Sequence, residues 1–112
     1  TPPKTLFPYT TLFRSPDYAL SKRQTAGFGA MISFKTDTHR RAIDALERTR
    51  LILFAESLGG TESLITYPLV QTHGAIPKPM LDKIGIDDRL LRLSVGIEDV
   101  EDLLADLDQA LA

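Results

Sequence analysis

The fold is decided between residues 55 and 98, where the chain reads AESLGGTESL at 55–64, QTHG at 71–74 and LRLSVGIE at 91–98. The apolar run before residue 56 predicts a strand, and the two glycines after it predict a turn whose backbone can approach a ligand closely. A later strand presents Arg92 among leucines, and a guanidinium is a planar fork that binds a carboxylate through two hydrogen bonds. The residues alone therefore predict a pocket for a small carboxylate, without catalytic machinery.

Short apolar runs and amphipathic segments alternate on both sides of this stretch. The run at 51–55 is apolar on both faces, which predicts a covered strand in the interior of a sheet. In the last strand Arg92 and Ser94 alternate with leucines, so they share the face opposite to the leucines. The sequence predicts an α+β fold, with a mostly antiparallel four-stranded sheet and helices on one face. The expected strands are 30–35, 51–55, 63–67 and 90–95, and the expected main helices are 38–49, 77–85 and 100–111.

Composition limits the class of protein. A chain of 112 residues has room for one domain, and 43% hydrophobic with 25% charged residues is ordinary for a soluble globular protein. The net charge of −2 gives no attraction to nucleic acid or to an anionic membrane, so neither is an expected partner. The absence of cysteine removes disulfides, cysteine zinc sites and thiol nucleophiles, and it fits a cytoplasmic protein.

Residues 1–15, TPPKTLFPYTTLFRS, differ from the rest of the chain. They carry three prolines and sustain no helical or strand period. The stretch resembles translated sequencing-adapter sequence, and the alternative is a disordered proline-rich tail. We therefore expect a non-native or disordered leader at 1–15 and one domain at 16–112. Because the chain has no initiator methionine, we also expect it to be a fragment.

The blocks at 56–64 and 91–98 together resemble the C-terminal domain of the Cys/Met-metabolism pyridoxal-phosphate (PLP) enzymes, over about 16–112. This group includes cystathionine γ-synthases, cystathionine lyases and O-acetylhomoserine sulfhydrylases. The resemblance implies the small C-terminal domain of a fold-type I enzyme, whose PLP is held by a large domain that this chain lacks. None of the lysines lies in the family's cofactor-lysine context. We therefore expect no catalytic residue, no bound cofactor and no activity in this chain alone.

The resemblance also implies roles for four residues. Arg92 would bind the substrate α-carboxylate, Ser57 would lie beside that carboxylate, Thr72 would lie near the arginine, and Glu56 would line the entrance. The alternative for Arg92 is an arginine on a solvated strand face, and for Ser57 a serine that bonds its own turn. Ser57 has no neighbouring base within its motif, so we do not expect it to be a nucleophile.

Two functions of different classes follow. The first is a fragment of a PLP-dependent sulfur amino-acid enzyme, most like the cystathionine γ-synthases. Its parent would be a homotetramer that acts on activated homoserine, cysteine or cystathionine. The second is a stand-alone ferredoxin-like module that binds an amino acid or dimerises, suggested by the expected βαββαβ order. The reaction and the acyl group of the substrate stay open at this point.

Overall fold

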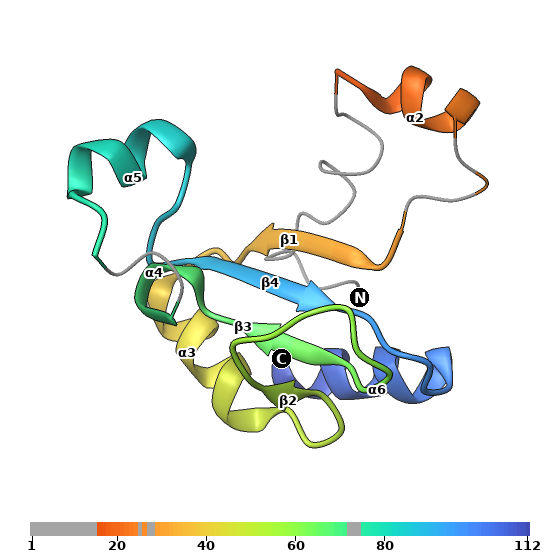
Figure 1. The fold of residues 1–112 in the computed structure, drawn as a ribbon. Coiled ribbons are helices and arrows are strands. Elements are labelled where there is room, and N and C mark those ends of the chain that lie inside the picture. The colour runs from red at the N-terminus through yellow and green to blue at the C-terminus, as the bar shows by residue number, and fades with distance from the viewer. Residues whose placement is uncertain (1–15, 25, 27–28, 72–74) are drawn as a thin grey trace.

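A computed structural model describes residues 16–24, 26, 29–71 and 75–112 (Figure 1). The expected strands and main helices all occur, and a four-residue helix follows the third strand. The expectation for residues 1–15 lies outside the described residues. The elements are α2 (Tyr18–Gln24), β1 (Met31–Lys35), α3 (His39–Arg48), β2 (Leu53–Phe54), β3 (Leu64–Thr66), α4 (Pro68–Gln71), α5 (Lys78–Ile84), β4 (Leu90–Ser94) and α6 (Val100–Ala110).

The four strands form one mixed sheet in the order β1-β4-β3-β2. β4 is antiparallel to both β1 and β3, whereas β2 runs parallel to β3. The prediction of a mostly antiparallel sheet was therefore wrong. The physical reason is the connection at 55–63, which returns the chain to the starting end of β2, as a parallel pair requires. The order also differs from that of a ferredoxin-like sheet, in which the first and third strands form the central pair.

The predicted interior strand at 51–55 is instead a two-residue edge strand. Leu53 is 52% exposed and Phe54 is 51% exposed. The preceding amides of residues 50–52 do not join the ladder, because the carboxylate of Asp106 on α6 accepts all three of them at 2.8 to 2.9 Å. The run at 51–55, which is apolar on both faces, therefore lies at the edge of the sheet.

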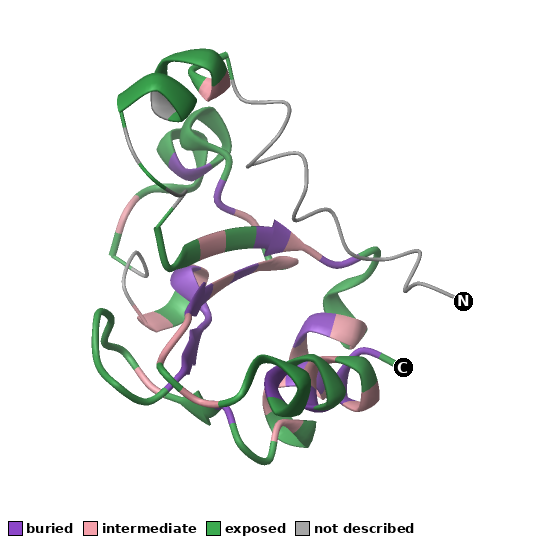
Figure 2. Cartoon of the chain, turned by 90° about the vertical axis from the view of Figure 1, so that its right-hand side faces the viewer, coloured by how far each residue is buried: buried purple, intermediate pink, exposed green. Residues whose placement is uncertain are grey.

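The core lies between the sheet and the pair α3 and α6 (Figure 1). Figure 2 shows the buried residues in this layer, whereas α2 and α5 are mostly exposed. The sequence predicted that all three main helices cover one face of the sheet. α5 lies beyond the end of the sheet in Figure 1, so its place on that face stays a prediction. None of the described helices has the length and apolar character needed to cross a membrane. The buried core consists of Phe34, Ala42, Ala45, Ile52, Ile65, Tyr67, Leu91, Leu93, Leu103 and Leu111.

Side-chain caps fix where the two core helices begin. The hydroxyl of Thr38 accepts the backbone N–H of Arg41 at 3.1 Å and so caps the start of α3. At α6 the carboxylate of Asp99 accepts the backbone N–H of Glu101 at 2.8 Å. Both helices therefore start where an oxygen replaces the missing backbone acceptor.

Candidate functional site

Arg92 lies at the centre of the sheet, on the face opposite to the core. In the ladder it stands opposite Ser33 of β1 and Thr66 of β3, while Leu91 and Leu93 point into the core. Its Nη2 lies 3.4 Å from Thr66 Oγ1. Its Nε is buried and has no hydrogen-bond partner among the described residues. A buried cationic donor without an acceptor is costly, so this guanidinium is suited to receive an anion.

The connection at 55–63 is tied down over the same face. Thr66 Oγ1, which contacts Arg92, donates to the carbonyl of Ala55 at 2.7 Å. The backbone N–H of Gly59 donates to Ser94 Oγ at 2.9 Å, and Gly59 takes a φ of 76°, which favours glycine. The exposed residues Glu56 and Ser57 lie between these two attachments.

The structure describes three of the four predicted site residues. Arg92 is in the sheet, and Glu56 and Ser57 lie in a segment whose residues Ala55 and Gly59 are bonded to Thr66 and Ser94, on the Arg92 face. No hydrogen bond joins Arg92 to Ser57 among the described residues. Thr72 lies outside the described residues, so its predicted place near the arginine stays a prediction.

Glu98 joins the two motifs just beyond the end of β4. Its Oε2 accepts the backbone N–H of Ser63 and its Oε1 accepts the Ser63 hydroxyl, both at 2.7 Å. The Ser63 oxygen in turn accepts the backbone N–H of Gly96 at 2.8 Å. These bonds from the Ser63 N–H and hydroxyl hold the pKa of Glu98 below its ordinary value. The contact is therefore made by the ionised carboxylate.

Sequence reasoning missed Thr66, Ser63 and Glu98 as parts of this site. Alternation along the last strand had placed Ser94 on the face of Arg92, and the structure confirms this. The pairing of β3 with β4 brings Thr66 beside Arg92, and strand register cannot be obtained from one strand alone. The signal that was available is the pair of polar residues that flank the short apolar run at 64–65.

A second polar cluster lies at the other end of β4. The hydroxyl of Tyr67 donates to the carbonyl of Asp88 at 3.0 Å and lies 3.3 Å from Nδ1 of His39. Burial raises the pKa of Tyr67, and the charges of Asp88 and Asp87 add to this. The ring of His39 is half exposed. The cluster links α3 to the turn before β4 and does not include Arg92.

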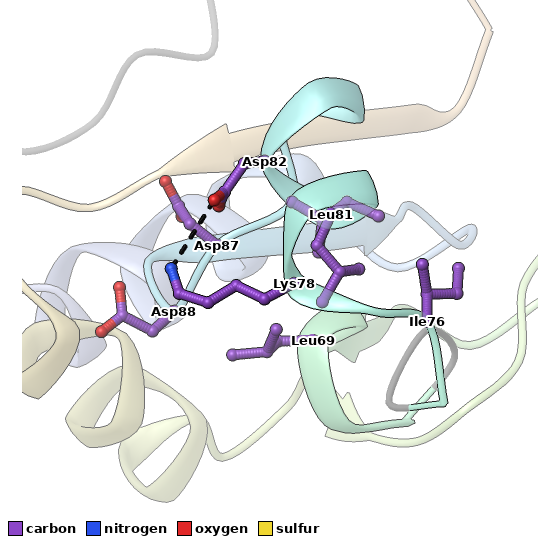
Figure 3. A pocket seen from close by; sticks show the side chains of 8 residues that line it. Leu69, Ile76, Lys78, Leu81, Asp82, Asp87 and Asp88 are labelled. Carbon is purple, nitrogen blue, oxygen red and sulfur yellow. Dashed lines mark ion pairs between the residues drawn. The ribbon is translucent and has the colours of Figure 1, made fainter.

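A hollow of about 420 Å³ also lies away from Arg92, between α4, α5 and the same turn (Figure 3). Its floor is apolar, with Leu69 and Leu81, and Lys78 pairs with Asp82 at its rim at 3.6 Å. Asp82, Asp87 and Asp88 make the lining acidic, which disfavours a substrate carboxylate, so this hollow is not the candidate site. The described residues contain no group of three or more metal-ligating side chains.

Comparison with known proteins decides the family. The profile of the family described as Cys/Met metabolism PLP-dependent enzyme matches residues 4–112. The chain belongs to this family. A cystathionine beta-lyase of Lactococcus lactis is 47% identical over 103 residues, which are 92% of this chain and 27% of that protein.

Solved structures of Cys/Met-metabolism enzymes share the fold. Cystathionine gamma-lyase of Lactobacillus plantarum, complexed with L-serine, matches with a TM-score of 0.86 and 42% identity, over 97% of this chain and 29% of that one. Cystathionine gamma synthase of Xanthomonas oryzae, in complex with cystathionine, matches with a TM-score of 0.85 and 42% identity, over 96% of this chain and 29% of that one. This chain therefore spans between a quarter and a third of the length of these relatives.

The family is PLP-dependent, which implies the cofactor in a full-length member. The described part of this chain does not fit it. Lys35 is 2.9 Å from Asp87 and Lys78 is 3.6 Å from Asp82, so both amines are held in ion pairs, and Lys22 and Lys83 are exposed on the short helices α2 and α5. A Schiff-base lysine needs an amine free to react with the cofactor. We therefore derive no step through PLP, and the expectation that this chain alone binds none stays a prediction.

Proposed function

We propose that this chain supplies the carboxylate-binding side of the substrate site in a Cys/Met-metabolism PLP-dependent enzyme. The observation that supports the proposal is the buried Nε of Arg92, which lacks an acceptor among the described residues. A substrate carboxylate would provide two oxygens to this guanidinium and so remove an unpaired buried donor. The cation therefore binds and orients the amino acid and takes no part in proton transfer.

The segment above Arg92 would complete the grip. Ser57 would lie beside the carboxylate, with Thr72 near the arginine. Glu56, which is exposed, would line the entrance and influence which side chains of the substrate are accepted. A carboxylate at the rim repels an acid at the far end of the substrate and attracts an amine, which is a means of selection.

Among the reactions of the family we propose cystathionine γ-synthase, acting on an activated homoserine and cysteine, in a homotetrameric cytoplasmic enzyme. The residues at 65–68 and 71–73, which resemble those of γ-synthases and O-acetylhomoserine thiolases, support this choice. The test is to recover the coding sequence upstream of residue 16 and assay the purified full-length protein. Formation of cystathionine should exceed its cleavage, and dominant cleavage would make the enzyme a lyase instead.

The role of Arg92 is tested in a hybrid enzyme, in which this chain replaces the matched 103 residues of the Lactococcus lactis beta-lyase. Arg92→Ala should keep the absorbance of bound PLP and lose kcat/KM for cystathionine. Truncating one partner of a buried charge pair costs roughly 2–5 kcal/mol, which is tens- to thousands-fold. Arg92→Lys should rescue poorly, because an ammonium lacks the fork.

The matched control is Arg40→Ala, since the side chain of Arg40 is 85% exposed and pairs with Asp44 on its own helix. It should leave kcat/KM unchanged within about twofold, because exposed pairs contribute little. An Arg92→Ala hybrid with the kinetics of this control would show that the arginine is a surface residue. If the hybrid without any substitution fails to bind PLP, this result would count against the proposal that this chain forms part of the substrate site.

A further inference from the structure

Two side chains of the stretch at 92–98, those of Ser94 and Glu98, bond directly to the segment at 55–63, and Arg92 is linked to it through Thr66. Ser94 Oγ accepts the backbone N–H of Gly59 at 2.9 Å. Glu98 accepts the N–H and the hydroxyl of Ser63 at 2.7 Å each. Arg92 reaches the segment through Thr66. The stretch therefore supplies the cation proposed to bind a carboxylate, and it also fastens the segment that carries Ser57.

The attachments divide the segment at defined points. Gly59 is two residues after Ser57, and Ser63 is the last residue before β3. The carbonyl of Ala55, at the other end, is held by Thr66. A segment fixed at both ends and near its middle has little freedom to move relative to the sheet, so the distance from Ser57 to Arg92 depends on these bonds.

The fastening at Ser63 is also closely packed. A Cβ on Gly96 would overlap the carbonyl oxygen of Thr61 and would lie 2.6 Å from the carbonyl carbon of Glu62. The backbone N–H of Ile97 donates to the same Thr61 oxygen at 2.8 Å. The two chain segments therefore touch along their backbones, and a change at Glu98 is passed to the segment above Arg92 with little slack.

We infer that Glu98 and Ser94 are positioning residues for the substrate carboxylate. Through Ser63 and Gly59 they hold the segment that carries Ser57 at the distance from Arg92 at which one carboxylate contacts both. This inference rests on the proposed function of Arg92. Neither residue touches the substrate, and each acts through a backbone amide of the segment.

The geometry selects the variants. Glu98→Gln keeps the side-chain volume but leaves one acceptor oxygen in place of two, so the N–H and the hydroxyl of Ser63 can no longer both donate as they do to the carboxylate. Ser94→Ala removes only the acceptor of the Gly59 N–H. Glu101→Gln is the matched control, because Glu101 is an exposed residue of α6 three positions further along the chain.

In the hybrid enzyme, Glu98→Gln and Ser94→Ala should each raise KM for cystathionine roughly tenfold, with kcat changed less than about threefold and the PLP absorbance intact. A loosened grip weakens ground-state and transition-state binding alike, so its effect falls on KM. Amide exchange in the 112-residue chain provides a second readout, because the Gly59 amide should exchange faster in both variants. Glu101→Gln should move neither quantity.

Two results would overturn the inference. One is a KM for both variants equal to that of the control, measured where circular dichroism shows all proteins folded. The other is activity lost only in proportion to folded protein, with KM unchanged, which is what a merely structural role produces. If Glu98→Gln fails to fold, Ser94→Ala carries the same test. If Arg92→Ala itself is normal, the proposed function fails, whereas an impaired Arg92→Ala with normal positioning variants removes this inference alone.

Discussion

A single carboxylate, that of Asp106, fixes the start of the second strand. Burial alone would raise the pKa of Asp106, but hydrogen bonds led by those from the Ile52 and Arg50 backbone amides hold it below its ordinary value. Asp106 is 5% exposed, so removing it leaves three amides without this acceptor. Asp106→Ala should lower the free energy of unfolding by roughly 2–4 kcal/mol.

Urea denaturation measures this loss as a lower midpoint at unchanged slope. Asp108→Ala, an exposed change on the same helix, should stay within about 0.5 kcal/mol of the original chain. Equal midpoints for the two variants would contradict the assignment of Asp106 as a shared acceptor.

Acid should destabilise the chain by protonating carboxylates that accept hydrogen bonds in the folded state. The folded pKa values of Glu98 and Asp106 both lie below their ordinary values, so their contribution is complete above the unfolded pKa, near 4. It is lost as pH falls through the depressed folded pKa. Urea midpoints should therefore be constant from neutral pH to about 5 and should fall below that. Glu98→Gln should make the fall shallower, and an unchanged slope in this variant would remove Glu98 from the explanation.

At the scale of elements, the close approach of the segments at 61–63 and 94–98 requires glycine at 96. Because a methyl at Gly96 would overlap backbone atoms, Gly96→Ala should cost about 1–3 kcal/mol, measured as a drop in Tm. Gly60→Ala is the matched control, since its Cβ would meet only the Glu62 side chain, at 3.5 Å. A Tm equal in the two variants would show that the segments can separate without cost.

The elements that the sequence predicted well are those with local signals. β1 and β4 follow their alternation, and α3 begins directly after Thr38, at the start of the helix expected at 38–49. The run at 51–55 was misplaced because its partner in the structure, Asp106, is 54 to 56 residues away and lies in a helix whose pattern signals only an apolar stripe. The face of Arg92 was likewise predictable, whereas its neighbour Thr66 depends on register between two strands.

At the scale of the whole molecule, the second strand leaves an apolar edge. Leu51, Leu53, Phe54 and Leu58 are 38 to 55% exposed, and β2 has β3 on one side only in the described sheet. An exposed apolar edge strand promotes pairing with another chain. We therefore expect the isolated chain to associate at about 100 μM in sedimentation velocity.

Phe54→Lys should shift this association toward monomer, because a lysine on an edge strand disfavours strand pairing. The control is Val70→Lys, which changes an equally apolar residue, 67% exposed, on α4 instead. Association that responds equally to both substitutions would show a general loss of apolar surface and no role for the edge.

The long separation between Asp106 and the amides it holds has a consequence during synthesis on the ribosome. The amides of 50–52 leave the exit tunnel more than fifty residues before their acceptor does. β1 likewise cannot pair until β4, its partner in the sheet, has emerged. A nascent chain that has emerged from the tunnel only as far as residues 95 to 105 would hold both antiparallel pairs but not the anchor of β2. In that interval Thr66 and Ser94 already hold the segment at 55–63, whereas the amides of residues 50–52 still lack their acceptor.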